Sequence, residues 1–598
     1  MTGQTLPRRA VLLDDARPGG SSRLFRDPVA WIEARTPEEA LDALARIDRA
    51  VADGLWVAGG FAYELGYLLE PRLRPHFRTP PDPLVAVGLY ERPVDVEGTA
   101  VFGAAAAGLR CSLGNAAPSW DAASYAAAFA HIRDYIAAGD VYQINLTFPL
   151  SFRIDGDPRA RLAGWRTLAR AGHAAWLRLD DRDVFSFSPE LFLHSDGGGL
   201  IRARPMKGTA ARGPDFTLDA AARAALVGDP KQRAENLMIV DLLRNDLSRV
   251  CAPGSVTVRD LFTVETYPTL HAMTSGVEGR LKDGVAPSDL LRALFPCGSV
   301  TGAPKVRAME IIAETEPAAR GFYCGAIGAI GPGLQLDLNV AIRTLVAERG
   351  SGTLRMGVGS GVVYDSQAAA EYEECLLKAR FAGAEPFELL ETLRWEDRAG
   401  FFFEGDHLAR LADAAAYFGA PFEAGAMRAA LAAHVAGEAG TRRVRLRLAL
   451  DGRTTVESVS LDAPFADGAP ARPQLRLHLA AARIASGDPF ARHKTTRRGA
   501  YDAALAEAKA AGADEAVLLN EHGRIADGSF TSLFVLRDGA LATPPPSEGA
   551  LDGVLKRVLM RRGAPPVIER ALTVDDLGAA EALFAGNSVR GLMRARLG

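Results

Sequence analysis

A lysine stands in a tight turn at Pro205–Thr209 (PMKGT), between an apolar segment and a charged one. Lysine is a rare residue at such a position unless its amine is used. A neutral amine is a nucleophile, and burial lowers the pKa of a lysine so that more of it is neutral near pH 7. Lys207 is therefore a candidate for a covalent step. A surface or structural ion pair is the alternative.

Three carboxylates and a second lysine stand on helices predicted in the same half. Glu371 and Glu374 are three residues apart in AAAEYEECLLKAR and share a helix face with Lys378. Glu235 lies in another predicted helix, RAENLMIVDLLRND. Oxygen ligands from two helices, completed by a substrate carboxylate and water, would suit Mg²⁺. An exposed charged face with a Glu374–Lys378 pair is the alternative.

Two other motifs are weaker. Glu190 follows Ser188-Pro189, directly after the apolar strand Val184–Phe187, where loss of water would raise its pKa and fit it for general acid catalysis. A loop or capping role is the alternative. The glycines of Gly357–Gly361 would let the backbone approach a ligand closely, or would simply form a turn or bulge.

The length of 598 residues predicts several domains. Alanines and glycines over Gly103–Ala117 predict a connection, and a further boundary is expected near Gly383–Pro386. Periodicity and capping residues predict the strands Val85–Tyr90 and Phe387–Trp395 and the helices Pro37–Ala52, Asp121–Gly139, Pro230–Val250 and His407–Phe418. Within Pro230–Val250, Leu237, Val240, Leu243 and Leu247 recur at helical spacing.

The net charge of −4 gives no support for nucleic acid or an anionic membrane as a partner. Five cysteines without CxxC spacing indicate a reducing cytosol, and hence a cytoplasmic protein. The four-residue apolar run near the N-terminus is too short for a signal peptide core, and no stretch of 18 apolar residues predicts a membrane span.

The block from about 120 to 382 resembles the chorismate-utilising enzymes, which include the large subunits of anthranilate synthase and aminodeoxychorismate synthase and the isochorismate synthases. The matching strings occur in family order: GDVYQINLT, SPELFL, RPMKGT, RAENLMIVDLLRNDLSRV, FPCGSVTGAPKVRAMEII, YCGAIG and GVGSGVVYDS…EYEECLLKA. The preceding residues resemble a short form of the family's N-terminal region, with weaker matches such as GGFAYELGY.

The resemblance implies a role for each matched residue. Glu190 would be the general acid that protonates the leaving C4 hydroxyl, and His271 would lie near the substrate ring. The magnesium positions would be Glu235, Glu371 and Glu374. The chorismate contacts would be Gly208, Thr209, Tyr323, Arg343, Gly359, Ser360, Gly361 and Lys378.

Lys207 decides the subfamily. Anthranilate synthases resemble this region but carry a small residue at that position, whereas aminodeoxychorismate synthases carry lysine. There the amine is thought to attack C2 of chorismate as the C4 hydroxyl leaves, after which ammonia adds at C4 and expels the lysine. Cys297 departs from the family, because many relatives have glycine in this turn.

The source of ammonia is missing from the sequence. A glutamine amidotransferase needs a nucleophilic cysteine on a sharp elbow, typically in G-x-C-x-G, and none of the five cysteines has that context. A separate glutamine amidotransferase subunit, or free ammonia, is therefore expected.

In the remaining block, Lys494 is one of five basic residues from Arg492 to Arg498 and alone would suggest a solvated face. The ordered strings FELLETLRW, GDHLARLADAAAYFG, HKTTRRGAYDAAL, DEAVLLNEHGRIADGSFTSLFV, LATPPPSEGALDGVLKRVL and AGNSVRGL, however, resemble the fold-type IV pyridoxal-phosphate enzymes. These include branched-chain and D-amino-acid aminotransferases and aminodeoxychorismate lyase.

This second resemblance implies pyridoxal 5'-phosphate as cofactor. Lys494 would bind it covalently and later move protons. Arg410 and the backbone of Val554 and Leu555, at a helix N-terminus, would hold its phosphate. Asp527 would face the pyridine nitrogen, where the family has glutamate. Further departures are Ser532, in place of asparagine, and Leu555-Lys556, in place of Thr-Arg.

Together the resemblances predict an α+β protein: a chorismate-utilising-enzyme β-sandwich with surrounding helices, followed by a fold-type IV unit. We expect an N-terminal region at 1–118, a chorismate-binding domain at 119–383 and a pyridoxal-phosphate domain at 387–598. The expected activity is amination of chorismate followed by elimination of pyruvate to 4-aminobenzoate for folate. By analogy with fold-type IV relatives, a homodimer through the last domain is expected.

Two alternatives stay open. The chain would be an anthranilate synthase component with an appended aminotransferase, against which Lys207 argues. Otherwise, the second half would be a cofactor-free module that binds the glutaminase or stabilises a dimer.

Overall fold

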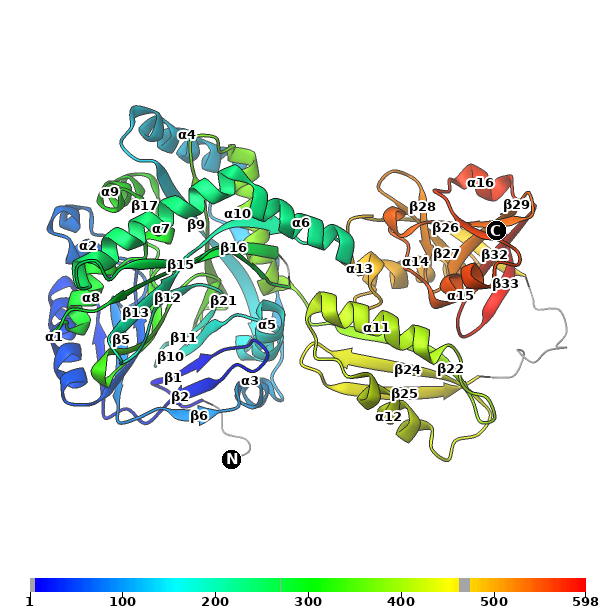
Figure 1. Cartoon of the computed structure of the whole chain (residues 1–598), viewed down its shortest axis with the longest axis horizontal. Helices are drawn as coiled ribbons and strands as arrows, with labels where there is room; N and C mark the ends of the chain where they lie inside the picture. Colours follow the sequence, from blue (N-terminus) through cyan, green and yellow to red (C-terminus); the bar gives the residue numbers. More distant parts are fainter. Residues whose placement is uncertain (1–5, 269, 462–473) are drawn as a thin grey trace. The chain divides into compact units, whose positions relative to one another are not determined.

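The computed structural model describes residues 6–268, 270–461 and 474–598. It divides into two compact units (Figure 1). Unit 1 comprises Met1–Ala211 and Arg223–Pro386, and unit 2 comprises Arg212–Ala222 and Phe387–Gly598. Unit 2 therefore includes a short segment of the chain that follows Lys207 closely in sequence.

Unit 1 is built on two large, mainly antiparallel sheets. The first sheet has the strand order β17 (Gly302–Ala303), β9 (Gln143–Gly156), β21 (Thr353–Val362), β20 (Thr344–Glu348), β11 (Arg182–Ser188), β10 (His173–Arg178), β1 (Ala10–Asp14), β2 (Ser22–Phe25) and β6 (Val94–Val96), with β7 (Cys111–Leu113) and β8 (Ala117–Pro118) paired to β9. The second has the order β14 (Met206–Ala211), β16 (Leu270–Arg280), β13 (Leu200–Arg204), β12 (Leu191–Asp196), β19 (Gln335–Val340), β18 (Ala326–Gly331), β4 (Trp56–Phe61), β5 (Val85–Tyr90) and β3 (Ala30–Ala34), with β15 (Thr257–Thr266) paired to β16.

Helices cover the outer faces of these sheets. One core cluster lies between the sheets and joins Val11 and Leu177 of the first to Ile327 and Ala329 of the second. Two further clusters fill the space between each sheet and its helices. The helices are α1 (Pro37–Ala52), α2 (Leu65–Leu69), α3 (Gly98–Ala106), α4 (Ala122–Ala138), α5 (Leu162–Ala169), α7 (Pro230–Val250), α8 (Pro287–Leu294), α9 (Lys305–Thr315) and α10 (Ala368–Gly383). A further helix, α6 (Phe216–Gly228), begins in unit 2 and ends in unit 1. The predicted β-sandwich with surrounding helices is confirmed.

Strands on both sides of the predicted boundary at 118/119 share these sheets. For example, β1 pairs with β10 and β4 pairs with β18. The division of this half into two domains stays a prediction, and residues 1–5 of the first lie outside the described residues.

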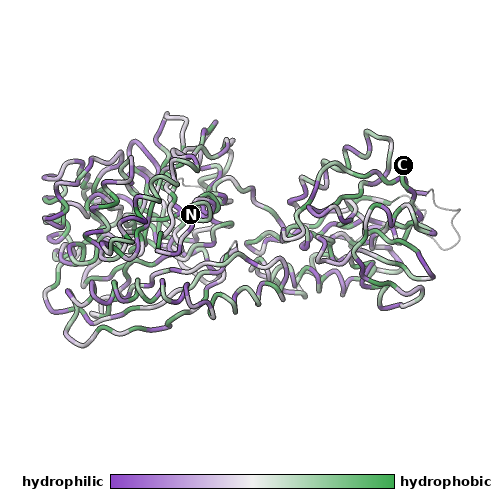
Figure 2. Tube along the Cα trace, turned by 90° about the horizontal axis from the view of Figure 1, so that it is seen from above, coloured by the Kyte–Doolittle hydropathy of each residue, from purple (hydrophilic) through white to green (hydrophobic). Residues whose placement is uncertain are grey.

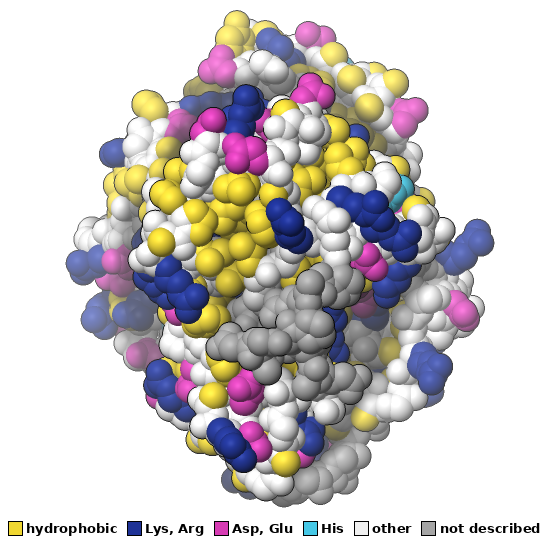
Figure 3. Space-filling view, turned by 90° about the vertical axis from the view of Figure 1, so that its right-hand side faces the viewer, with side chains coloured by type: hydrophobic (Ala, Val, Ile, Leu, Met, Phe, Trp, Pro, Cys, Tyr) yellow, Lys and Arg dark blue, Asp and Glu magenta, His cyan; other side chains and the backbone are white. Residues whose placement is uncertain are grey.

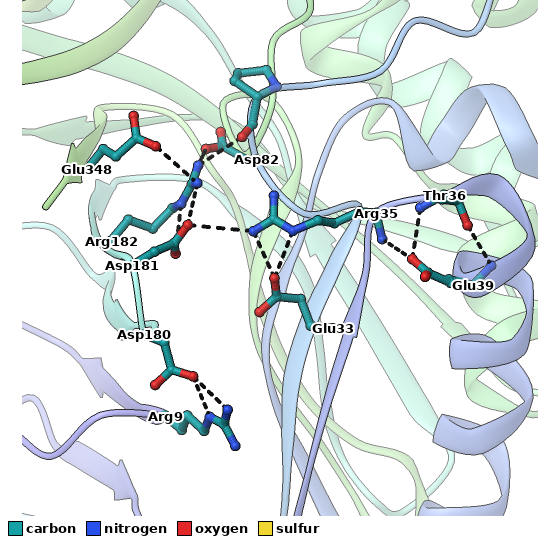
Figure 4. A network of polar contacts seen from close by, with 11 residues as sticks. Arg9, Glu33, Arg35, Thr36, Glu39, Asp82, Asp180, Asp181, Arg182 and Glu348 are labelled. Atoms are coloured by element: carbon teal, nitrogen blue, oxygen red, sulfur yellow. Dashed lines mark hydrogen bonds and ion pairs between the residues drawn. The ribbon is translucent and has the colours of Figure 1, made fainter. Parts of the chain in front are cut away.

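A buried polar network fixes one edge of unit 1 (Figure 4). Oδ1 of Asp82 accepts a hydrogen bond from Arg182 at 2.7 Å. The same Asp82 oxygen accepts from Arg355 at 2.8 Å. Oδ2 of Asp82 accepts from the backbone N of Phe322 at 3.1 Å. The carboxylate is almost fully buried, and two arginines compensate its charge, so loss of both would leave a buried unpaired charge. The network therefore ties β11 and β21 to the segment that carries Tyr323.

Unit 2 contains two sheets. The smaller has the order β23 (Gly400–Phe401), β22 (Glu388–Glu396), β24 (Thr441–Ala449) and β25 (Thr454–Ser460). The larger has the order β28 (Ile525–Gly528), β27 (Glu515–Asn520), β26 (Leu475–Ile484), β33 (Gly591–Leu597), β32 (Ala582–Asn587), β29 (Ser532–Arg537), β30 (Ala540–Thr543) and β31 (Val567–Glu569). The helices are α11 (Glu404–Phe418), α12 (Ala424–Val435), α13 (Pro489–Arg492), α14 (Gly499–Ala510), α15 (Val554–Arg562) and α16 (Val574–Gly578).

Hydrophobic and hydrophilic residues are interleaved along the trace of both units (Figure 2), as expected for elements with one buried and one exposed face. On the face drawn in Figure 3, Lys and Arg side chains are scattered around a central group of hydrophobic ones and form no basic stripe. No helix among the described residues is long and apolar enough to cross a membrane.

One sequence-based prediction was wrong. Gly103–Ala117 is not a plain connection, because its alanines extend the helix Gly98–Ala106, anchored by buried Phe102 and Ala105, and the residues beyond add the short strands β7 and β8. Leu237 is 44% exposed, whereas the other three residues of its periodic set are buried. The helix that this periodicity predicted is nevertheless present.

Candidate active sites

Unit 1 contains a cavity of about 250 Å³ between β14, β21, α7 and α10. Most of the residues singled out in the sequence of this half line it: Glu190, Lys207, Gly208, Thr209, Glu235, Tyr323, Arg343, Gly359, Gly361, Glu371, Glu374 and Lys378. His271 and Ser360 do not. His271 is buried on β16 with its Nδ1 3.0 Å from Thr266 Oγ1, and Ser360 Oγ is 2.9 Å from the Tyr125 hydroxyl.

Lys207 extends from β14 at an irregularity of the strand. The pairing of β14 with β16 shifts between Met206 and Thr209, and Gly208 has a φ of +90°, which favours glycine. The Lys207 amine lies over the bare backbone of Gly361, because a Cβ added there would meet Nζ at 2.5 Å. Any side chain at 361 would displace the amine.

Desolvation changes the ionisation of this lysine. Burial lowers the pKa of Lys207 from its ordinary value, and the Lys378 ammonium lowers it further, while Glu235 opposes the shift. A larger fraction of the amine is therefore neutral at a given pH than for an exposed lysine. The amine meets the electronic requirement for a nucleophile.

Glu190 presents a carboxyl group with the opposite shift. Its side chain is buried, Oε1 has no hydrogen-bond partner, and burial raises its pKa to about 7 in spite of Ser299 and Lys207 nearby. Its backbone N donates to Ser188 Oγ at 3.1 Å, which fixes the turn before β12. A carboxyl group that keeps its proton near neutral pH can act as a general acid.

Three carboxylates, on α7 and α10, face the cavity. Burial raises the pKa of Glu235, and Glu371 and Glu374 add repulsion that a cation would relieve. Burial opposes the ionisation of Glu374, but the Lys378 ammonium 2.7 Å away lowers its pKa overall. Within the described ranges, no group of three or more His, Cys, Asp or Glu stands close enough to hold a metal ion. The residues fit Mg²⁺ in donor type and charge, without a preformed cage.

Two cations are placed to meet an anionic ligand. Arg343 has a φ of +49°, an uncommon conformation for a non-glycine residue, and no acidic partner among the residues that the structure describes. Lys378 donates from Nζ to the Gly359 carbonyl at 2.8 Å. Beside them, the Tyr323 ring is seated on Gly357, where an added Cβ would meet it at 2.1 Å.

Gln143 belongs to this site and was missed in the sequence. It is fully buried at the start of β9, and neither its amide oxygen nor its amide nitrogen has a hydrogen-bond partner. Nε2 lies 3.0 Å from the Cβ position of Gly361, next to the Lys207 amine. Nothing in the sequence distinguishes it from Asn145 and Thr147, the other polar residues at the start of this strand.

Unit 2 contains a cavity of about 360 Å³. All the cofactor residues predicted in this half line it: Arg410, Lys494, Asp527, Val554 and Leu555. Burial lowers the pKa of Lys494 to about 7, with the positive charges of Arg410 and Arg498 contributing. The lysine is therefore poised to be neutral, as reaction with an aldehyde requires.

Asp527 compensates for its short side chain through its backbone neighbours. Its Oδ2 accepts from the backbone N of Leu551 at 3.1 Å, and its Oδ1 accepts from Gly528 N at 3.0 Å. Burial raises its pKa to about 7. The carboxyl group is thus held in one orientation facing the cavity, where it would share a proton with a basic ring nitrogen.

Glu391 is a second residue that the sequence did not single out. It is buried on β22 and binds Arg410 through two hydrogen bonds, from Nε at 2.8 Å and from NH2 at 2.7 Å. His407 Nδ1 lies 2.6 Å from the same carboxylate. Burial opposes the charge, but Arg410 and His407 hold the pKa of Glu391 well below its usual range.

Arg410 is thereby aimed at the start of α15. Its NH1 donates to the Asp552 carbonyl at 3.3 Å, beside Gly553, the N-cap of the helix. Free backbone N–H groups at a helix N-terminus and a fixed guanidinium form a phosphate site. With Lys494 and Asp527 in the same cavity, the residues present fit pyridoxal phosphate.

Comparisons with known proteins agree with this division. Residues 104–383 match the family of chorismate binding enzymes, and residues 388–597 match class IV aminotransferases. The chain joins a chorismate-binding enzyme domain to a class IV aminotransferase domain. A solved amino-acid aminotransferase from Mesorhizobium loti is 38% identical to the second domain, covering 36% of this chain and 100% of its own, with a TM-score of 0.33.

Two curated relatives match the chorismate-binding domain. The aminodeoxychorismate synthase component 1 of Klebsiella aerogenes is 46% identical over 250 residues, 42% of this chain and 55% of that protein. The anthranilate synthase component 1 of Neisseria meningitidis serogroup B is 41% identical over 249 residues, 42% of this chain and 50% of that protein. The chain spans about half the length of the curated relatives it matches. Its identity to the aminodeoxychorismate synthase component is only slightly higher than its identity to the anthranilate synthase component.

If Glu391 orients Arg410, then Glu391→Gln will weaken pyridoxal phosphate binding about tenfold or more, because the amide cannot hold the guanidinium through two charged hydrogen bonds. The dissociation constant of the cofactor, measured by absorbance on the full chain, checks this. Glu388→Gln is the matched control on the same strand. Glu388 lies outside the cavity, and its carboxylate forms a longer ion pair, of 3.5 Å, with Arg447. Equal affinities of the two variants would contradict the assignment.

Proposed function

We propose that the chorismate-binding domain aminates chorismate at C4 to give 4-amino-4-deoxychorismate. The aminotransferase domain then eliminates pyruvate from this product to give 4-aminobenzoate for folate synthesis. The observation that carries the proposal is the pairing, in one cavity, of a lysine with a lowered pKa and a glutamate with a raised one. A nucleophile and an acid facing the same space fit displacement of a hydroxyl group.

In the first domain, the neutral Lys207 amine attacks C2 of chorismate, and the ring double bonds shift as the C4–O bond breaks. Glu190 gives its proton to the departing hydroxyl, which leaves as water. Ammonia then adds at C4, the double bonds shift back, and the C2–N bond to Lys207 breaks. Arg343 and Lys378 bind the substrate carboxylates, and Glu235, Glu371 and Glu374 would hold Mg²⁺ that offsets their repulsion.

In the second domain, Arg410 and the α15 N-terminus would bind the phosphate of pyridoxal phosphate, and Asp527 would face its ring nitrogen. The cofactor supplies an electron sink for removal of the C4 proton. Lys494 would hold the cofactor, and its buried amine would take the C4 proton of the substrate. Loss of pyruvate leaves an aromatic ring, which provides the driving force.

We propose a separate glutamine amidotransferase as the ammonia source. The component 1 designation of the Klebsiella relative supports it. Four of the cysteines, Cys251, Cys297, Cys324 and Cys375, are buried, and burial raises the pKa of each, which is the opposite of an activated thiol.

Product analysis tests the assignment. With chorismate, Mg²⁺ and ammonia, the chain is expected to form 4-aminobenzoate when pyridoxal phosphate is present and aminodeoxychorismate when it is withheld. Mass spectrometry of the products distinguishes them. Anthranilate as the main product would refute the proposal and favour the activity named for the Neisseria relative.

Two lysine variants separate the domains. Lys207→Ala should lose amination but still convert supplied aminodeoxychorismate to 4-aminobenzoate. Lys494→Ala should accumulate aminodeoxychorismate. If Lys494→Ala still makes 4-aminobenzoate at the wild-type rate, then the second domain is a binding module.

The acid role of Glu190 predicts a pH limit. At a constant concentration of neutral ammonia, kcat/KM for amination should fall as pH rises through about 7, because the carboxyl group then loses its proton. Glu190→Gln should lower kcat about 100-fold and remove this limb. Glu314→Gln is the control, because Glu314 is partly exposed on α9. A wild-type profile that stays flat from pH 6 to 9 (roughly the range in which such a carboxyl group titrates) would exclude the role.

A further inference from the structure

The second cavity carries more positive charge than a cofactor phosphate requires. Six arginines line it: Arg410, Arg443, Arg445, Arg497, Arg498 and Arg590. Among the residues that the structure describes, only two carboxylates do so, Asp502 and Asp527. Glu391 holds Arg410 at the phosphate site. The remaining arginines therefore face a space that is otherwise poor in negative charge.

Arg443 and Arg445 come from one face of β24, with the core residues Val444 and Leu446 on the other face. Arg443 lies directly opposite Arg394 of β22 in the strand register. Like charges opposite one another destabilise a sheet. Among the described residues, no carboxylate forms an ion pair with Arg443. Strand stability does not explain this arginine.

Arg445 already has one ion-pair partner, Glu457. Its NH1 donates to Glu457 at 3.2 Å, an ion pair whose two side chains are about half exposed, while its Nε is buried without a hydrogen-bond partner. A buried donor of this kind costs free energy until an acceptor arrives. Arg445 can therefore support an anion beside Arg443 but is not the primary candidate.

Arg497 comes from the loop that carries Lys494, three residues further along the chain. Its guanidinium lies over the Phe490 ring at 4.3 Å, which fixes its direction without neutralising it. No acidic side chain within the described ranges pairs with it. Its neighbour Arg498 differs, because Arg498 donates to the Ser529 carbonyl and lies 3.7 Å from Asp502.

We propose that Arg443 and Arg497 bind the two carboxylates of a small dicarboxylate amine, with its amino group toward Lys494. A guanidinium matches a carboxylate through two parallel hydrogen bonds. An ordinary monocarboxylate amino acid would leave one of the two cations unpaired. This inference rests on the proposed function, in which the substrate carries a ring carboxylate and an enolpyruvyl carboxylate. After elimination, each product keeps one carboxylate.

The test uses the full chain loaded with pyridoxal phosphate, whose absorbance reports on the second cavity alone. The probes are 3-(carboxymethoxy)benzoate, which has two carboxylates in the relation found in chorismate, and benzoate, which has one. Wild type should bind the dicarboxylate about tenfold or more tightly than benzoate. Arg443→Met and Arg497→Met should each weaken the dicarboxylate about tenfold, and Arg443→Lys and Arg497→Lys, which keep the charge, should lose less.

Arg453→Met is the matched control, because Arg453 follows β24, is 79% exposed on its side chain and pairs with Asp451 outside the cavity. Retention of the cofactor shows that each variant is folded. Equal binding of the two probes by wild type, or unchanged dicarboxylate binding in both Met variants, would overturn the inference. If the arginine dependence is found but aminodeoxychorismate is not converted, the proposed function fails and the dicarboxylate site stands.

Discussion

The desolvation of the Lys207 amine over the bare backbone of Gly361 is the constraint on which the first site depends. An ammonium held there is costly, so the equilibrium moves toward the neutral amine. Burial has the complementary effect on Glu190, because it favours the protonated, uncharged form of this carboxyl group. A single physical cause, removal of water, thus prepares a base-like amine and an acid in one cavity. The glycine is required because any side chain would occupy the place of the amine.

The same cause operates in the second domain with a different outcome. Burial brings the pKa values of Lys494 and Asp527 together at about 7. Arg410, in contrast, keeps its charge because Glu391 neutralises it in the interior. Lys494 and Asp527 can therefore exchange protons near neutral pH, whereas Arg410 stays charged. The cavity of this domain also keeps Arg443 and Arg497, with which no carboxylate of the described residues forms an ion pair, and this suits an anionic substrate.

Much of the site could be predicted from the sequence, because ordered strings fix which residues face one another. Lys207, Glu190 and the α10 carboxylates line one cavity as expected, and so do the cofactor residues of the second domain. His271 and Ser360 were placed near the ligand by their strings, but the alternation of side chains along β16 and β21 turns them away from the cavity. A sequence motif shows which residues are neighbours along the chain, whereas the alternation of side chains along a strand decides which face of the sheet each one occupies.

Other residues carried no readable signal. Glu391 is one of several charged residues in FELLETLRW, and only the packing of β22 against α11 shows that it meets Arg410. Gln143 becomes notable only when its two amide atoms are found buried without partners. The surplus of arginines likewise appears only when β24 and the Lys494 loop are seen to line the same cavity. These features depend on contacts between residues that are far apart in the sequence, and periodicity along the chain does not predict such contacts.

The most direct measurement is peptide mass spectrometry of the chain after incubation with chorismate and Mg²⁺ in the absence of ammonia. The account predicts that the peptide containing Lys207 gains the mass of chorismate less one water, and that Gly361→Ala abolishes this adduct because it displaces the amine. Added ammonia should release the adduct as the aminated product. Chorismate that is aminated at the normal rate while Lys207 never carries an adduct, with or without ammonia, would contradict the account.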